Sequence, residues 1–424
     1  MKQTRLSRYI IPSVISMILV GTYTNIDGLF IGNVTGNPGL AAINFAWPIV
    51  AFITSLGTGI GIGGSVLLNR ARGEGEETRA DRLRSVILFL LLLSGALFGA
   101  IFKFTSPALL TLMGAGDDPA VYEYALVYAD VISVGAIFQV VGAGLVALLR
   151  NEGKTWFSML SCALGLVLHI LLDALLVGKY TLAGVAISTV ASQAAVALLC
   201  LFALRKCRFA KPTAKDFLPV LCESSAPLGI NFVPSVVLLF TNFFAMSVGG
   251  TAAVTAYTVM SYAVYTFDYA FQGVCDGVQP VISYAVGAND KKEERRALTA
   301  ACKVLGISVL LSVASTPLLM AFLPDFFGAD SEAATMMQSG FIIYAASYPF
   351  KAAVKYFGSY FYAKGRALYA NLLIYADPLL FTPLLLVALP PFFGIDGIWL
   401  SLTLAQLALT LPGTVLFIRE LKKA

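Results

Sequence analysis

Apolar residues occur along this chain in long runs rather than in the alternating pattern of a half-buried strand. Glycine, proline or charged clusters bound each run, and a bilayer-crossing helix needs roughly 20 apolar residues. The predicted spans lie near residues 9–31, 43–68, 83–104, 121–149, 156–177, 180–204, 217–246, 252–285, 297–322, 332–362, 367–390 and 395–418. The pattern therefore predicts an all-α polytopic membrane protein with about twelve transmembrane helices.

Composition excludes a soluble globule, because 58% of the 424 residues are hydrophobic and only 12% are charged. The mean hydropathy of +0.81 agrees with this exclusion. The first apolar run is too long for a signal peptide and has no small-residue cleavage site, so we expect it to remain as a span. The six cysteines have no CxxC spacing and predict neither a disulfide framework nor a metal site.

Basic residues fall mostly in alternate loops, beginning with Lys2, Arg5 and Arg8 before the first span. The intervening loops 32–39, 247–251 and 324–332 contain no Lys or Arg. By the positive-inside rule we expect both termini in the cytoplasm and a multi-pass location in the cell membrane. These short clusters are explained by topology, so the net charge of +5 does not indicate a nucleic-acid partner.

The chain also contains an internal repeat. Residues 184–193 align with residues 397–406 at an offset of 213, and Pro12 aligns with Pro227 at an offset of 215. Six spans in each half give the halves the same orientation, so they are parallel repeats. We therefore expect an N-terminal six-helix lobe at 1–204, a basic cytoplasmic linker at 205–216 and a C-terminal six-helix lobe at 217–424.

Asp27 lies inside the first apolar run. A carboxylate in hydrocarbon costs roughly 3 kcal/mol or more, so such acids usually face a protein interior or a wet cavity. The alternative is that Asp27 is solvated at the outer end of its helix. His169 and Asp173 form an i, i+4 pair on the fifth span. The single histidine of the chain would alone suggest a core residue, but this pairing favours a functional site.

Alternating span directions place further polar residues at the depth of these three groups. Tyr128 and Asp130 lie on the fourth span, and Thr189 and Gln193 lie on the sixth. We therefore expect four helices of the N-terminal lobe to bring polar side chains together in the outer half of the membrane.

The C-terminal lobe carries charges nearer to mid-membrane. They are candidates for a substrate cavity or for a structural ion network, and the spacing leaves both open: Asp268, Asp276, Lys351, Lys355 and Asp377. Because unpaired charge is costly at this depth, Lys351 or Lys355 is expected to pair with Asp377 or Asp268. Kinked or interrupted helices are predicted near these charges at Pro280, Pro349 and Pro378, with Gly273 and Gly277.

Three stretches resemble the multidrug and toxic compound extrusion (MATE) family of cation-coupled transporters. They are residues 25–33 with 39–42, residues 277–288, and residues 394–399. The resemblance implies a coupling-ion site at Asp27 and Asp173, with Tyr128 and Thr189 nearby, and no prosthetic cofactor. His169 stands where relatives typically carry asparagine. A histidine titrates near neutrality, so the coupling ion is left open between H⁺ and Na⁺.

The resemblance implies a monomeric antiporter, not an enzyme, that exports organic small molecules or drugs by alternating access within membrane lipid. We expect a proton rather than sodium as the coupling ion. One alternative keeps the fold but exports a lipid-linked or anionic solute, which Lys351 and Lys355 favour. A more distant alternative is an intramembrane enzyme using His169 and Asp173 as base and orienter. No nucleophile or metal-ligand set accompanies that pair.

Overall fold

The computed structural model describes residues 6–327 and 331–423. Lys2 and Arg5, which entered the topology prediction, lie outside these residues. The described chain is built from helices and short connections, and no strand occurs within it. The prediction of an all-α membrane protein is confirmed.

The helices of the N-terminal half are α1 (Ser7–Thr35), α2 (Asn37–Gly73), α3 (Glu77–Leu112), η1 (Ala115–Asp117), α4 (Pro119–Asn151) and α5 (Thr155–Leu204). The second half contains α6 (Ala214–Gly287), α7 (Lys291–Phe326), α8 (Ser331–Ala363), α9 (Ala367–Ala376), η2 (Asp377–Phe381), α10 (Thr382–Ala388), α11 (Pro390–Phe393) and α12 (Ile395–Lys423).

Two of these helices each contain two spans. The 50 residues of α5 and the 74 residues of α6 are too long for one crossing, since a bilayer core of about 30 Å needs about 20 helical residues. The chain reverses at Thr181 in α5 and at Gly250 in α6, where φ is 49° and 61°. With these breaks, and with α9 to α11 counted as one interrupted span, the described residues form the twelve predicted spans.

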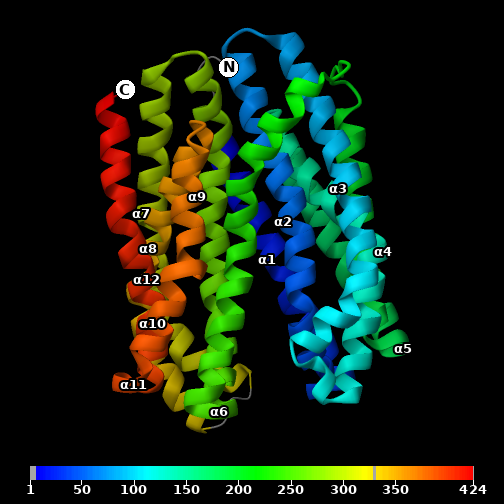
Figure 1. Ribbon diagram of the computed structural model, residues 1–424, viewed down its shortest axis with the longest axis vertical. Helices are drawn as coiled ribbons and strands as arrows, with labels where there is room; N and C mark the ends of the chain where they lie inside the picture. The colour runs from blue at the N-terminus through cyan, green and yellow to red at the C-terminus, as the bar shows by residue number, and fades with distance from the viewer. Residues whose placement is uncertain (1–5, 328–330, 424) are drawn as a thin grey trace.

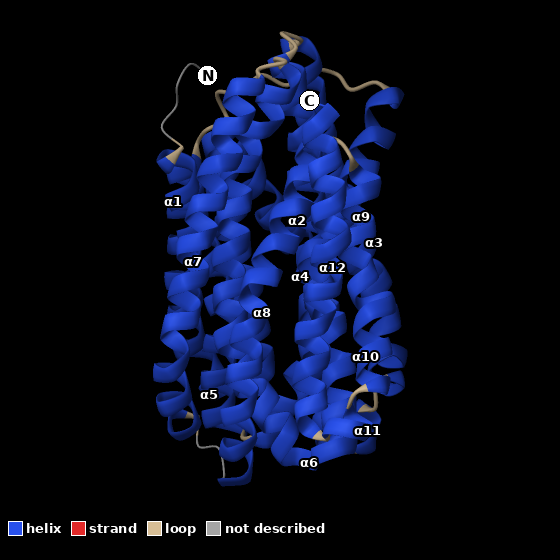
Figure 2. Ribbon diagram, turned by 90° about the vertical axis from the view of Figure 1, so that its left-hand side faces the viewer, coloured by secondary structure: helices blue, strands red, loops and turns tan. Residues whose placement is uncertain are grey.

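The spans gather into two lobes, as the first view shows (Figure 1). Helices α1 to α5 lie on one side, and α7 to α12 lie on the other with most of α6. The helices run along the long axis, and the loops collect at its two ends (Figure 2). α1 begins and α12 ends at the same end (Figure 1). We call it the basic end, because the Arg/Lys-rich loops lie there, and we call the opposite end the far end.

The linker between the lobes is shorter than predicted, because α6 begins at Ala214. A capping box stabilises this start: the Thr213 backbone N–H and hydroxyl both donate to Asp216 Oδ2, at 2.9 and 2.7 Å. Asp216 also accepts from Arg82 of α3 at 3.1 Å. The start of the second lobe is therefore tied to the first at the basic end.

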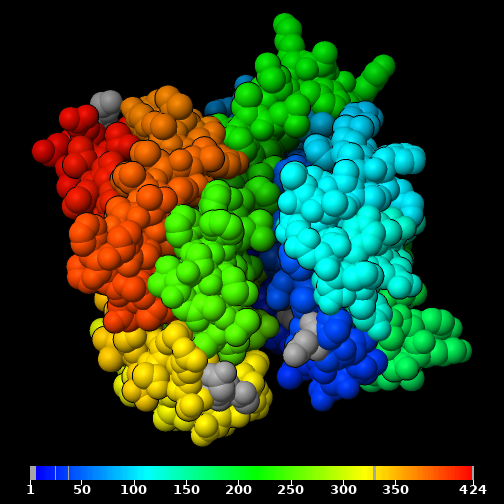
Figure 3. Space-filling model, turned by 60° about the horizontal axis from the view of Figure 1, so that its bottom comes forward, coloured from blue at the N-terminus to red at the C-terminus, as the bar shows by residue number. Residues whose placement is uncertain are grey.

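The lobes pack closely at the basic end and diverge at the far end. Gly277 lies against the backbone of Ile10, and Gly273 lies against that of Val14, so α6 and α1 approach without intervening side chains. A cleft separates the lobes when the far end faces the viewer (Figure 3). A kinked or interrupted eighth span was predicted near Gly273 and Gly277. α6 is not interrupted there, and both glycines are close-packing positions within it.

Of the three prolines predicted to disturb helices, only Pro378 lies in an interruption, the π-helical turn η2. Pro280 and Pro349 lie inside continuous α6 and α8. A bend that was not predicted occurs in α4, whose two parts meet at 60° around Gly135. Gly135 packs against Val190, where a Cβ would collide with that side chain.

Candidate ion-coupling and substrate site

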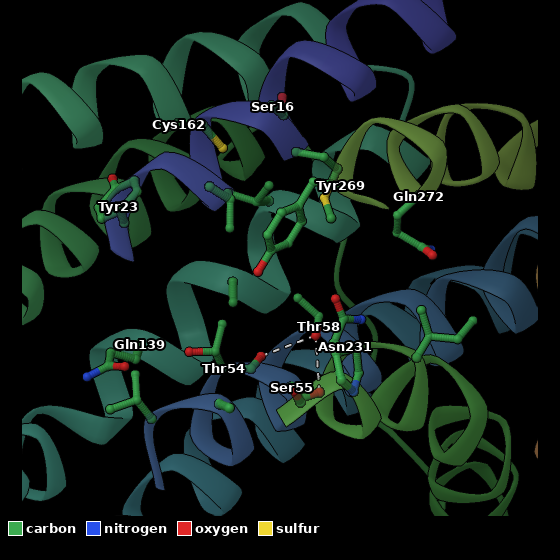
Figure 4. Close-up of a pocket in the computed structure, with 18 of the residues that line it drawn as sticks. Ser16, Tyr23, Thr54, Ser55, Thr58, Gln139, Cys162, Asn231, Tyr269 and Gln272 are labelled. Atoms are coloured by element: carbon green, nitrogen blue, oxygen red, sulfur yellow. Dashed lines mark hydrogen bonds between the residues drawn. The ribbon is translucent and has the colours of Figure 1, made fainter. Parts of the chain in front are cut away.

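A cavity of about 190 Å³ lies between the lobes and is lined by residues of both. Polar side chains from several helices border this space (Figure 4). Ser16 and Tyr23 come from α1, Thr54 from α2, and Asn231 and Tyr269 from α6. A cavity between the lobes of a membrane protein, with several polar side chains in a mostly apolar wall, is where a solute pathway is expected.

Asp27, His169 and Asp173 form a buried cluster at the wall of this cavity, which we call the N-lobe triad. His169 Nε2 lies 2.7 Å from Asp27 Oδ1 and 3.2 Å from Asp173 Oδ2. Asp27 lines the cavity, whereas His169 and Asp173 are fully buried behind it. The Tyr23 ring lies 4.8 Å from the imidazole between ring centroids. The structure thus brings together the three groups that sequence reasoning placed at one depth.

Charge balance within the triad favours a bound cation. A single imidazole nitrogen faces both carboxyl groups, and its one proton cannot be donated fully to each. Two carboxylates beside one neutral imidazole would leave uncompensated negative charge in a low-dielectric interior, which is costly. A proton or a small cation bound by the triad reduces this cost, because it removes part of the negative charge.

The triad also has the spacing of a cation site. One ligand atom from each of its residues lies within 4.8 Å of the others. Carboxylate oxygens suit hard cations such as Na⁺, and the imidazole can instead carry a proton itself. Geometry alone therefore accommodates either coupling ion.

Three of the four other polar residues predicted for this lobe line the cavity: Tyr128, Thr189 and Gln193. Asp130 does not, because it pairs with Lys103 at 2.8 Å on the surface, where its side chain is 37% exposed. Two residues along a helix correspond to a rotation of about 200°, so Asp130 must face away from the cavity when Tyr128 faces it. The expectation that both residues join one cluster did not allow for this rotation.

The second lobe contains one of the ion pairs that its spacing predicted. Lys355 Nζ lies 3.2 Å from Asp268 Oδ2, with both side chains at the cavity wall. Asp377 instead accepts neutral hydrogen bonds, from Thr382 Oγ1 at 2.6 Å and Gln406 Nε2 at 2.7 Å. Of the two acids, Asp268 is therefore the one that pairs with a lysine. Asp377 lies on the π-helical turn and is bonded to side chains of α10 and α12.

Lys351 has a different environment. It lines a smaller pocket of about 90 Å³ together with Lys355 and Asp377. Its Nζ lies 5.9 Å from the centroid of the Tyr344 ring, a cation–π distance, and forms no ion pair with any described residue. Lys351 thus makes no close ion-pair contact with a described residue, in a partly aromatic pocket that also holds Asp268 and Asp377.

A second buried ion pair joins the two lobes, and sequence reasoning missed it. Arg150 Nη2 lies 2.8 Å from Asp276 Oδ2, and Gln272 Nε2 donates to the other carboxylate oxygen at 2.8 Å. Arg150 lies just beyond the predicted span 121–149 and so was expected in a loop, but α4 continues to Asn151 and leaves Arg150 only 3% exposed. Asp276, expected in the cavity, does line it, but as the partner of this arginine.

The uncharged lining residues Tyr23, Tyr265, Tyr269 and Asn231 were also missed. Within spans that are apolar all round, hydrophobic periodicity does not tell which face meets lipid and which meets a cavity. The polar tips of these side chains were the only available signal, and similar residues also occur at other positions of the chain.

The chain is similar in sequence and in fold to known membrane transporters. Multidrug export protein MepA of Staphylococcus aureus (strain NCTC 8325 / PS 47) is 22% identical over 411 residues, covering 93% of this chain and 89% of that protein. An outward-facing structure of a multidrug resistance MATE family transporter of the MOP superfamily superposes with a TM-score of 0.88 at 21% identity, covering 99% and 95% of the two chains. A MOP superfamily transporter from Pyrococcus furiosus Vc1 (DSM3638), for which reverse polarity of the binding pocket suggests a different function, gives 0.86 at 21% identity over 98% and 95%.

The MatE family model matches the chain twice, at residues 12–175 and 227–375. These matches begin at the two prolines aligned by the internal repeat, so the family model supports the repeat independently. Because a transporter family matches most of the chain, the alternative of an intramembrane enzyme is excluded. The chain belongs to the MatE (MATE) family of membrane transporters.

Proposed function

We propose that this protein is a proton-coupled antiporter that exports organic solutes through the central cavity. The observation that carries the proposal is the N-lobe triad, in which cavity-facing Asp27 contacts the buried pair His169 and Asp173. Multidrug export by a relative similar along 93% of the chain supports the solute class. His169 supports H⁺ over Na⁺, because imidazole exchanges protons near neutral pH and is a poor ligand for Na⁺.

The triad suggests how ion and solute exchange. A proton entering from the cavity meets Asp27 first and is shared with His169 2.7 Å away. Each bound proton removes one negative charge from the triad, so the wall of the cavity attracts a cationic solute less strongly and the solute is released. Loss of the proton restores the negative charge and the affinity for the next solute. Proton and solute thus compete for one site, as antiport requires.

The orientation of the chain in the membrane decides whether this conformation is open to the outside or to the cytoplasm. We infer from the positive-inside rule that the basic end, with both termini, is cytoplasmic. The cleft at the far end then opens outward, and the packed glycines and ion pairs close the cytoplasmic side (Figure 3). Export requires the opposite state, in which the lobes rock apart at the basic end. We propose that one monomer in the cell membrane performs the whole cycle.

The proposal is tested with purified protein in proteoliposomes and a fluorescent lipophilic cation such as ethidium. A pH gradient and a sodium gradient are imposed separately, and accumulation of the cation is followed. We expect the pH gradient to drive accumulation and the sodium gradient at equal pH to have no effect. Accumulation driven by sodium alone would replace the proton by sodium, and the absence of accumulation under both gradients would overturn antiport.

A second candidate function is export of an anionic or lipid-linked solute by the same fold. Lys351 favours it, since a lysine without an acidic partner can receive a carboxylate or phosphate in the smaller pocket. A transporter of the same fold from Pyrococcus furiosus is described with reverse polarity of its binding pocket, which suggests a different function for that protein. The same proteoliposomes loaded with a lipophilic monoanion distinguish the two. Gradient-driven movement of the monoanion that is lost in Lys351→Met would favour this candidate.

A further inference from the structure

A groove separate from the central cavity lies at the basic end of the N-terminal lobe. It has a volume of about 370 Å³ and is formed where α5 begins and where α5 ends, next to the linker. We call it the α5 groove. Its lining residues are Gly153, Lys154, Thr155, Trp156, Phe157, Phe202, Ala203, Arg205 and Lys206.

The charge of the α5 groove is one-sided, with three basic side chains and no acidic one. Lys154 Nζ donates to the Ala203 carbonyl oxygen at 2.6 Å, which joins the two ends of α5. The Arg205 guanidinium lies 3.9 Å from the centroid of the Phe202 ring, and Lys206 is exposed. None of the three forms an ion pair within residues 6–327 and 331–423.

Two basic residues next to the groove, unlike the three that line it, are paired with an acid. Arg72 and Arg84 both lie 2.7 Å from carboxylate oxygens of Glu152, which directly precedes the groove in sequence. Glu152 is therefore fully engaged by these two partners and does not neutralise the groove. An anion entering the groove meets Lys154, Arg205 and Lys206 without competition from a protein carboxylate.

Two large side chains place the α5 groove at the membrane boundary. Trp156 is 55% exposed and Phe202 is 56% exposed, one on the first turn and one on the last turn of α5. Exposed tryptophan beside lysine and arginine, at the end of an apolar span, is typical of the level of lipid headgroups. The groove thus combines cations at headgroup depth with apolar surface leading toward the acyl chains.

We propose that the α5 groove binds an anionic phospholipid of the cytoplasmic leaflet. The headgroup phosphate lies between Arg205 and Lys206, near the unpaired N–H groups of the first turn of α5, and the acyl chains run along Trp156 and Phe202. Bound there, the lipid joins the ends of the two spans of α5 that carry His169 and Thr189. The site thus braces the helix hairpin that holds part of the coupling site.

The test uses the fluorescence of Trp156 in proteoliposomes. The chain has three tryptophans, so the contribution of Trp156 is the difference between the wild type and Trp156→Phe. Phosphatidylglycerol or phosphatidylcholine brominated near the top of the acyl chain is added at equal fractions. We expect brominated phosphatidylglycerol to quench Trp156 at lower fractions than brominated phosphatidylcholine does.

Two charge-matched variants decide whether the preference belongs to the α5 groove. Arg205→Gln with Lys206→Gln should weaken the preference by about 30-fold, as expected for two cations at an anionic surface. Lys211→Gln with Lys215→Gln removes the same charge from exposed residues outside the groove. This variant should keep most of the preference for phosphatidylglycerol. Lys206→Gln alone should weaken the preference by an intermediate amount. Lys206 forms no ion pair in the described chain, so this single variant repeats the test if the double variant does not fold.

Three results would overturn the proposal. Equal quenching by the two lipids excludes headgroup selection, and an equal loss in both double variants reduces the effect to diffuse surface charge. Removal of the preference by millimolar inorganic phosphate identifies free phosphate, rather than lipid, as the ligand.

Discussion

The ion pair between Arg150 of α4 and Asp276 of α6 predicts how the two states of the transporter are balanced. It joins the lobes beside the cavity, toward the basic end, with a 2.8 Å contact between side chains that are 4% and 3% exposed. Separation of the lobes at this end must break it. We therefore expect Asp276→Asn to favour the state that is open at the basic end.

The size of this shift follows from burial. The amide introduced by Asp276→Asn can still accept the hydrogen bond of Gln272, but it leaves the buried guanidinium without a counter-charge. Removing one partner of a buried pair costs about 3 to 5 kcal/mol. The cost applies only while the lobes are packed at the basic end, because Arg150 is solvated once they separate. The equilibrium should therefore shift by about 150-fold to several thousandfold.

Cys162 provides the readout, since its side chain lines the cavity. In a variant that retains Cys162 alone, a membrane-impermeant maleimide is added to either face of vesicles of known orientation. In this variant with Asp276 intact, we expect the maleimide to label Cys162 from the far end. With Asp276→Asn, labelling should occur from the basic end instead.

A matched pair inside one lobe separates this effect from general destabilisation. Arg84 Nε lies 2.7 Å from Glu152 Oε1, with side chains 2% and 4% exposed, but both residues belong to the N-terminal lobe. Glu152→Gln should lower the thermal stability without changing the side from which Cys162 is labelled. If Asp276→Asn behaves like Glu152→Gln, the interlobe pair is only structural and the reasoning is refuted.

Three further predictions concern charged groups near the cavity. Asp27→Asn should abolish uphill efflux while the protein stays folded, because an amide cannot exchange a proton, whereas Asp130→Asn at the surface should transport normally; full gradient-driven efflux by Asp27→Asn contradicts the coupling role. His169→Asn should shift the pH dependence of initial transport rates more than their maximum, since an imidazole titrates near neutrality and an amide does not, and an unchanged pH profile would make His169 a packing residue. Lys355→Met should lower the free energy of unfolding by about 3 to 5 kcal/mol, and adding Asp268→Leu should restore most of it; a fully stable single variant would show that the 3.2 Å pair contributes little.

The sequence by itself determined the spans, the repeat and the depth of the candidate site. A bilayer imposes the same requirement on every span, so twelve apolar runs and the basic loops between them are readable one segment at a time. Asp27, His169 and Asp173 were recognisable for a similar reason. A carboxylate inside an apolar run is costly wherever it faces, and so points to a function. The i, i+4 pairing with Asp173 extended this interpretation to His169.

Tertiary structure alone decided which of these groups meet. Asp27 and His169 are 142 positions apart, and Arg150 and Asp276 are 126 positions apart. Their contacts depend on how each helix is rotated and on how the lobes are docked. Rotation turned Asp130 out to Lys103, and docking buried an arginine that the sequence placed in a loop. Hydropathy is a property of single segments and fixes where a charge lies along the membrane normal, whereas its partner is set by packing between segments, which no single segment encodes.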